Sequence, residues 1–219
     1  KEVAPDGRVA LFKPEFKLNK DRGCVVLKGI TNLPLAAEQL LKELKEKNLC
    51  VEDSLVVLPL KEFEEAVFGI VNVSVANLRS QPKHSGELAT QALLGMPLKI
   101  YDRKDHWYLV QTPDRYLAWL DDGAFIRCDS MAVEKYKQGE LAVVNVPLVQ
   151  ATDRPAGGIA VRDLTLGNVV KVINREGSNT KIEFPDGVIG YLATKNVIPV
   201  DAWRTRRKEL RLSELASSF

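Results

Sequence analysis

The sequence predicts a mainly β protein, in which an α+β unit at the N-terminus is followed by two small β-barrels in tandem. Three observations lead to this prediction. Residues 1–68 show a β-α-β pattern, short strands and turns begin near residue 69, and a set of landmark residues recurs 72 positions later. Short strands joined by turns are typical of small barrels, and self-similarity at a fixed spacing indicates a repeated unit.

The N-terminal unit is predicted from a change of hydrophobic period. Residues 8–12 and 24–29 are β-branched and apolar, as strands are. Residues 33–47 have apolar side chains at helical spacing, and Pro34 falls in the first turn, where a missing N–H is harmless. A third strand is expected over residues 51–58. Nothing in this unit resembles a phosphate loop or a catalytic cluster.

The repeat predicts barrels over residues 69–135 and 136–201. The pairs that share the 72-residue spacing are Gly95 and Gly167, the Pro113-Asp114 and Pro185-Asp186 turns, and Trp119 and Tyr191. The openings of the two copies match one position off this register, at Val71 and Val144. We therefore expect residues 69–130 and 140–201 to superpose. Residues 202–219 are predicted to be a linker entering a helix.

Composition limits the possible partners. The chain has 31 basic and 29 acidic side chains, a balance that gives no reason to expect nucleic acid. Its apolar stretches are too short to span a bilayer. Cys24 and Cys50 lie in apolar runs and are predicted to be buried thiols. With only two histidines and no CxxC pair, we expect neither a metal nor a cofactor.

Residues 71–123 contain three ordered motifs, NLRSQP, ELATQALLG and WYLVQTPDRYLAW. This segment closely resembles the first bacterial SH3-like domain of NlpC-type cell-wall cysteine peptidases, the γ-D-glutamyl-L-diamino-acid endopeptidases also called dipeptidyl-peptidase VI. The second predicted barrel resembles the companion SH3-like domain more weakly. The first 68 residues are similar to the leading segment of some members.

The resemblance implies a recognition region and not a complete peptidase. The family's nucleophile lies in a DCSG motif that this sequence lacks, and Cys128, in FIRCDSM, has no suitably spaced His. No catalytic residue is therefore assigned. The family's catalytic module follows the second barrel, and SELASSF at 213–219 resembles its lead-in. Implied partners are a catalytic NlpC-type domain in cis and a murein stem peptide with a free N-terminal L-Ala, in an exported protein of the periplasm or cell envelope. The alternative is a stand-alone SH3-like binding or scaffolding protein.

The same resemblance implies a substrate-binding role for Glu87 in ELATQ and Tyr116 in PDRYLAW, which would hold the amino group of the stem peptide. A carboxylate facing an ammonium makes a charge-assisted hydrogen bond. Trp119 is a further candidate for substrate binding. Two of these candidates have a structural alternative, because Glu87 could be an exposed loop carboxylate and Trp119 could belong to the core.

Overall fold

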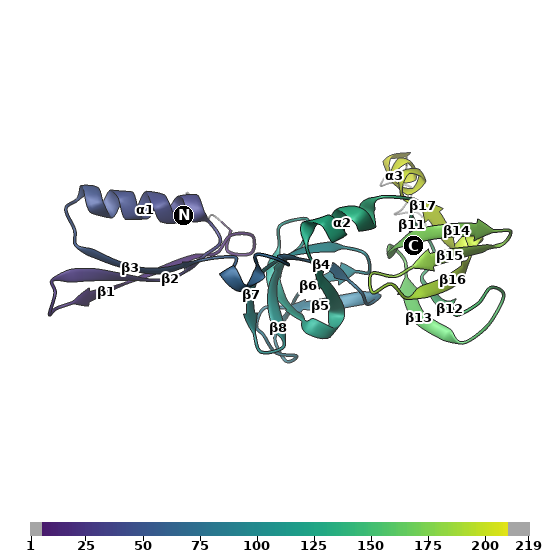
Figure 1. The fold of residues 1–219 in the computed structure, drawn as a ribbon, viewed down its shortest axis with the longest axis horizontal. Coiled ribbons are helices and arrows are strands. Elements are labelled where there is room, and N and C mark those ends of the chain that lie inside the picture. The colour runs from purple at the N-terminus through teal and green to yellow at the C-terminus, as the bar shows by residue number, and fades with distance from the viewer. Residues whose placement is uncertain (1–5, 210–219) are drawn as a thin grey trace. The chain divides into compact units, whose positions relative to one another are not determined.

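A computed structural model describes the backbone of residues 6–209 and side chains as far as Thr205. Its strands form one three-stranded sheet and two seven-stranded sheets, so the predicted mainly β character is confirmed (Figure 1). The chain divides into two compact units. One consists of residues up to 68, 78–90 and 98–122, and the other of 69–77, 91–97 and residues from 123 onward. Among the described residues, no helix has the length and apolar character needed to span a membrane.

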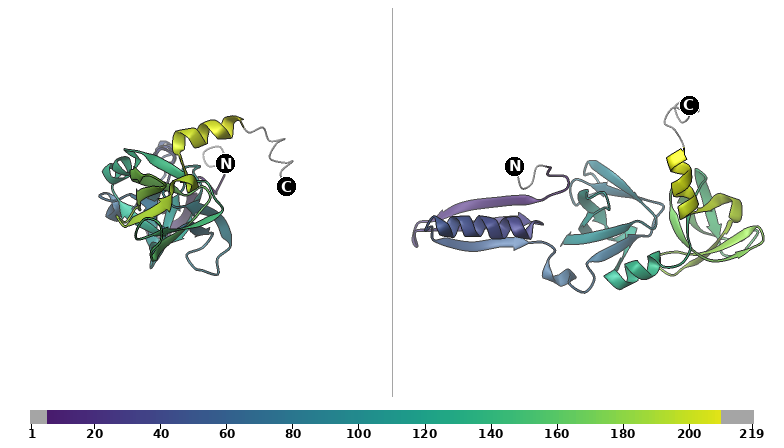
Figure 2. Two further views of the ribbon diagram at one scale, coloured as in Figure 1. Left: turned by 90° about the vertical axis from the view of Figure 1, so that its right-hand side faces the viewer. Right: turned by 90° about the horizontal axis from the view of Figure 1, so that it is seen from above.

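The predicted N-terminal α+β unit, which is part of the first compact unit, is a three-stranded sheet with one helix over one face (Figure 2). Strands β1 (Phe12–Asn19) and β2 (Cys24–Thr31) are antiparallel, and β2 pairs in parallel with β3 (Val51–Val57). Helix α1 (Pro34–Glu46) makes the crossover between β2 and β3. Leu27 of β2 and two alanines of α1, Ala36 and Ala37, are buried, so the unit rests on a small core.

The strand predicted at residues 8–12 is wrong, because β1 begins only at Phe12. Residues before it form a turn, in which the Asp6 carboxylate accepts a hydrogen bond from the Arg8 amide at 2.9 Å. Pro14 lies within β1, and a proline is unfavourable in a strand because it has no N–H to donate. Asn32 N donates to Leu11 O, so the backbone N–H and C=O groups of every second β1 residue, counted from Leu11, point towards β2. The backbone of Pro14 points away from β2, on the free edge of the sheet, where no amide donor is needed.

The prediction of buried thiols at Cys24 and Cys50 is also wrong. Cys24 is buried, but its sulfur forms a disulfide bond with Cys50, with a Cα–Cα distance of 4.6 Å. The bond joins the start of β2 to the residue before β3, which is the neighbouring parallel strand. The two cysteines are 26 residues apart with a helix between them, and only the strand pairing brings them together.

The first seven-stranded sheet has the strand order β10-β4-β7-β8-β9-β5-β6, and the second has the order β13-β12-β16-β15-β14-β11-β17. The strands of the first sheet are β4 (Phe68–Val71), β5 (Val75–Arg79), β6 (Leu88–Leu93), β7 (Pro97–Lys104), β8 (Trp107–Gln111), β9 (Leu117–Asp121) and β10 (Phe125–Cys128). Those of the second are β11 (Leu141–Val144), β12 (Leu148–Thr152), β13 (Ala160–Thr165), β14 (Val169–Glu176), β15 (Asn179–Glu183), β16 (Ile189–Ala193) and β17 (Val197–Pro199). Read from opposite ends, the two orders are the same.

Individual hydrogen bonds also recur at the predicted spacing. Gly95 N donates to Val71 O, and Gly167 N donates to Val144 O, both at 2.9 Å. Within the two Pro-Asp turns, Thr112 N donates to Tyr116 O at 3.0 Å and Phe184 N donates to Val188 O at 2.9 Å. The one-position offset at Val71 and Val144 in the sequence is thus the offset at which equivalent bonds form.

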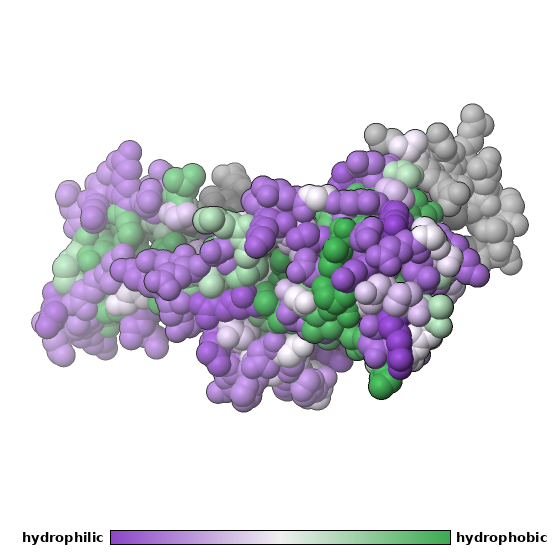
Figure 3. Space-filling view, turned by 45° about the vertical axis from the view of Figure 1, so that its right-hand side comes forward, coloured by the Kyte–Doolittle hydropathy of each residue, from purple (hydrophilic) through white to green (hydrophobic). Residues whose placement is uncertain are grey.

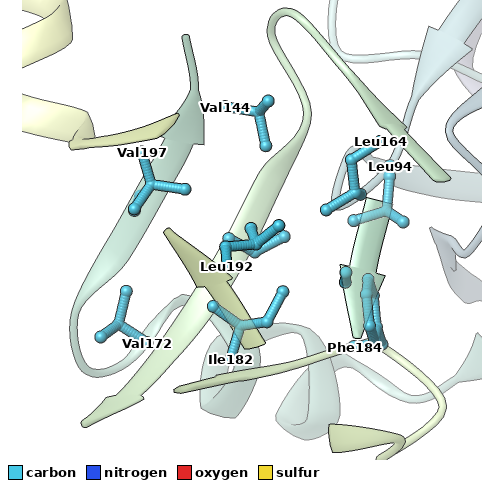
Figure 4. Packing of buried hydrophobic residues seen from close by; sticks show 11 residues of the cluster. Leu94, Val144, Leu164, Val172, Ile182, Phe184, Leu192 and Val197 are labelled. Atoms are coloured by element: carbon cyan, nitrogen blue, oxygen red, sulfur yellow. The ribbon is translucent and has the colours of Figure 1, made fainter. Parts of the chain in front are cut away.

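The second sheet encloses an apolar core (Figure 4). Its fully buried members include Leu164, Ile182 and Leu94. Leu94 comes from the turn after β6, a strand of the first sheet. Backbone bonds tie this turn to β14, since Val169 N donates to Leu94 O at 2.9 Å. The β6–β7 turn is therefore part of the packing of the second sheet.

A polar network fixes the start of the 72–74 segment to the same sheet. The Arg162 guanidinium donates to Asn72 Oδ1 at 2.6 Å and to Asp186 Oδ2 at 2.7 Å, and it lies 4.4 Å from the Phe184 ring centroid. Desolvation opposes ionisation of Asp186, but hydrogen bonds from Asn72 and Arg162 outweigh it and lower the pKa of that carboxyl.

We expect Arg162→Met to lower the free energy of unfolding by about 2 kcal/mol, because methionine keeps the apolar stem but removes the charged donor to Asp186 and leaves Asn72 Oδ1 without its donor. Asp186 has a lowered folded-state pKa, so its contribution is present above the ordinary value of about 3.9 and is lost as the pH falls through the folded-state pKa. Urea unfolding at pH 7 and pH 3 measures this. A loss equally large at both pH values would contradict the ionic role of Arg162.

Two helices follow the sheets. Helix α2 (Ser130–Lys137) was not predicted, although Asp129 caps it by accepting a hydrogen bond from Ala132 N at 2.7 Å. Helix α3 (Val200–Glu209) begins at the end of the range predicted for the second barrel and covers the start of the expected linker. The SELASSF segment lies outside the described residues. The described part of the chain also contains three 3₁₀ turns, at Lys61–Phe63, Asp122–Ala124 and Thr194–Asn196.

Candidate functional site

Strand β9 turns Leu117 and Trp119 to the outer side of the first sheet. Their neighbours Ala118 and Leu120 are buried, and side chains alternate between the faces of a strand. On the outer side, Leu117 and Trp119 join a cluster around Leu58, Tyr101 and Leu109, to which Leu11 and Leu60 also belong. Trp119 is half-buried there, so it is a wall residue of the outer face and not part of the sheet interior.

A pocket of about 210 Å³ lies beside this cluster. Its apolar wall is made by Leu11, Ile30, Leu109, Leu117 and Trp119. Its polar wall is made by Lys13, Ser80 and Asp102. Apolar walls that carry a few polar groups are the usual form of a small-molecule site, and this pocket has both kinds of wall.

The segment before β1 is fixed along one side of the pocket by hydrogen bonds. Leu117 N donates to Arg8 O at 2.7 Å, and Gln111 Nε2 donates to Val9 O at 3.3 Å. Leu11 N donates to the Asn32 side-chain oxygen at 2.7 Å. These three bonds hold residues 8–11 in place along that side of the pocket.

Asp102 is the titratable group that the pocket perturbs. Burial raises the pKa of its carboxyl, the hydrogen bond from Arg103 N opposes that rise, and the charge of Glu62 adds to it. Asp102 lies at an irregularity in the pairing of β7 with β8, which breaks the simple alternation of faces. Sequence reasoning missed Asp102 because no motif accompanies it, and an acidic residue at a bulge has no clear periodic signal.

Glu87 and Tyr116 stand at the same end of the first sheet. Ser80, just after β5, donates its amide to Glu87 O at 2.9 Å, and β9 runs antiparallel to β5 through the pair Arg79 and Trp119. The starts of β6 and β9 thus both lie beside the end of β5. Glu87 is exposed and Tyr116 is half-buried. Of the three predicted site residues, only Trp119 lines the pocket, and substrate binding by all three stays a prediction.

Cys128 is partly buried, and burial together with the charge of Asp129 raises the pKa of its thiol. A raised pKa disfavours the thiolate, which is the nucleophilic form. The two histidines each lie near one carboxylate, at 3.8 Å for His84 and Asp121 and 3.0 Å for His106 and Asp122. Within the described part of the chain, no group of three or more His, Cys, Asp or Glu side chains could hold a metal ion.

The surface in Figure 3 is largely hydrophilic, with smaller hydrophobic areas between. Exposed apolar side chains of the described residues include Phe16 and Leu18 on β1, Leu148 at the start of β12 and Ile159 just before β13. Single exposed apolar residues are normal in soluble proteins. The pocket beside Trp119 is therefore the better candidate for a binding site.

Residues 78–125 match the family described as the bacterial dipeptidyl-peptidase Sh3 domain. The matched segment contains Glu87, Tyr116 and Trp119. No curated protein matches the sequence.

Solved structures of NlpC/P60 proteins are among those that resemble the chain. An NlpC/P60 family protein from Bacillus cereus ATCC 10987 is 16% identical with a TM-score of 0.51, over 60% of this chain and 55% of that one. An NlpC/P60 endopeptidase from Photobacterium damselae subsp. piscicida is 14% identical with a TM-score of 0.48, over 91% of this chain and 49% of that one. The Bacillus likeness shows a shared fold. The chain matches about half the length of each of these proteins.

Proposed function

We propose that this chain is the peptide-recognition region of a γ-D-glutamyl-L-diamino-acid cysteine endopeptidase that acts on the bacterial cell wall. The observation that carries the proposal is the match of residues 78–125 to the bacterial dipeptidyl-peptidase Sh3 domain. In this proposal the nucleophile belongs to an NlpC-type domain in cis, and residues 1–219 supply recognition and no catalytic group. The raised pKa of the Cys128 thiol supports this division.

The two seven-stranded sheets are proposed to be tandem SH3-like barrels. Their shared strand order supports this, as do the equivalent bonds of Gly95 and Gly167. We further propose that the protein is exported to the periplasm or cell envelope. The disulfide between Cys24 and Cys50 supports export, because such bonds persist in oxidising compartments and are rare in the cytosol.

Recognition of the stem peptide is assigned to Glu87 and Tyr116. Glu87 would accept hydrogen bonds from the free ammonium of the N-terminal L-Ala. The Tyr116 hydroxyl oxygen would accept a further hydrogen bond from the same ammonium. An acylated peptide has no ammonium and would leave the carboxylate unpaired, which makes a free amine a requirement. The position of both residues at one end of the sheet supports a common site.

We expect Glu87→Gln, in the protein joined to its NlpC-type domain, to lower kcat/KM for L-Ala-γ-D-Glu-diaminopimelate by about ten- to a hundredfold. A charged hydrogen bond contributes roughly 1.5–3 kcal/mol, which corresponds to this range. Thermal stability is expected to stay unchanged, since Glu87 is exposed. Tyr116→Phe should lower kcat/KM less.

The matched control is Glu65→Gln, an exposed carboxylate outside the proposed site. Residues 1–219 alone should release no product. If free-amine and N-acetylated peptides were cleaved equally well, recognition of the amine would be wrong. Binding of another protein or a glycan without any effect on peptide cleavage would favour the stand-alone scaffolding function.

A further inference from the structure

We infer that the pocket beside Trp119 binds an α-amino carboxylate, with the ammonium facing Asp102, the carboxylate facing Lys13 and the aliphatic part against Trp119 and Leu117. This site is separate from the proposed amine site, because neither Glu87 nor Tyr116 lines it. The same chemistry occurs in a free amino acid and in the side-chain end of a diamino acid within a peptide.

The size of the pocket limits the ligand. At about 210 Å³ it is smaller than the roughly 300–1,000 Å³ of sites for drug-sized molecules. The space suits one amino acid and not a longer peptide. The apolar wall of Leu11, Ile30 and Trp119 would hold a short aliphatic group.

Asp102 has capacity for a cationic ligand. Its Oδ1 accepts the hydrogen bond from Arg103 N at 2.7 Å, while Oδ2 has no hydrogen-bond partner among the described residues. A partly buried carboxylate is destabilised by lost solvation, as the raised pKa of Asp102 reflects. A ligand ammonium would offset that cost with a charge-assisted hydrogen bond.

Lys13 supplies the opposite charge on the same pocket. It is an exposed residue of β1, and in the described part of the chain it makes no ion pair, with Asp102 or with any other carboxylate. Two opposite charges that line one pocket without pairing with each other match a ligand whose ammonium and carboxylate groups are attached to the same carbon. Ser80 adds a hydroxyl that can donate to the ligand carboxylate.

The test is a ¹H–¹⁵N NMR titration of residues 1–219 with L-alanine, L-valine, N-acetyl-L-valine, L-valine amide and L-Ala-γ-D-Glu-meso-diaminopimelate. We expect binding of compounds with both free charges and affinities at least about tenfold weaker for the acetylated and amidated forms. Tighter binding of the free amino acids identifies them as the source, and tighter binding of the tripeptide identifies the diamino acid.

Variants connect the binding to the pocket. Asp102→Asn and Lys13→Gln should each weaken binding by about tenfold. Lys17→Gln, further along β1 and outside the pocket, should leave binding unchanged. An unchanged circular dichroism spectrum shows that a variant is folded. If Asp102→Asn does not fold, the binding measured with Lys13→Gln tests the inference in its place. Equal binding of charged and blocked valine, no binding of any compound, or loss of L-valine binding in Lys17→Gln would each overturn the inference.

Discussion

Gly95→Ala is expected to lower the free energy of unfolding by about 3 kcal/mol or more. Gly95 has φ +84°, a region in which a residue with a Cβ is strained by roughly 1–2 kcal/mol. A Cβ at this position would also lie 2.2 Å from Val169 O and 3.1 Å from Val169 C. Both atoms are backbone, and Val169 N is bonded to Leu94 O, so β14 cannot move away without losing that bond.

Gly139→Ala is the matched control, because Gly139 has φ +98° and a Cβ added there would have no atom within 4 Å. Its cost is the backbone strain alone, roughly 1–2 kcal/mol. Gly167→Ala should fall between the two, since its Cβ would meet only the end of the flexible Leu93 side chain at 2.9 Å. Urea unfolding of the three variants measures the order. Equal losses for Gly95→Ala and Gly139→Ala would show that the contact with Val169 is unimportant.

The sequence predicted the mainly β character and the strands beside each Pro-Asp turn well, because these signals are local and occur twice. Each Pro-Asp turn separates two runs of β-formers, and the structure has strands on both sides of each turn. The repeat also identified Gly95 and Gly167 before any contact was known. Helix α1 followed in the same way from its apolar spacing.

What could not be predicted depends on contacts between distant parts of the chain. Strand β1 is defined by its pairing with β2, while its own residues alternate weakly and include Pro14. The pocket depends on Lys13 and Asp102, which are 89 positions apart and belong to no common motif. Helix α2 is different, because its Asp129 cap is a local signal that the sequence does carry.

Removal of the Cys24–Cys50 disulfide, by Cys24→Ser or by reduction, is expected to destabilise the N-terminal sheet by about 3 kcal/mol. A cross-link that closes a loop of 26 residues restricts the unfolded chain by roughly this amount. The sheet has only three strands and one helix, with few fully buried side chains besides Leu27. Such small units depend on cross-links more than large ones do.

Hydrogen exchange separates this local effect from general unfolding. In Cys24→Ser, amides of β2 and β3 should lose protection, while amides of β14 and β15 should keep theirs. Leu11 directly precedes β1 and Lys13 belongs to it, and both line the pocket. The loss of the disulfide should therefore also weaken the binding of L-valine in the pocket. Cys128→Ser is the control, because Cys128 forms no disulfide and its removal should leave β2 and β3 protected. Full protection of these strands after reduction would show that strand pairing and α1 hold the sheet without the bond.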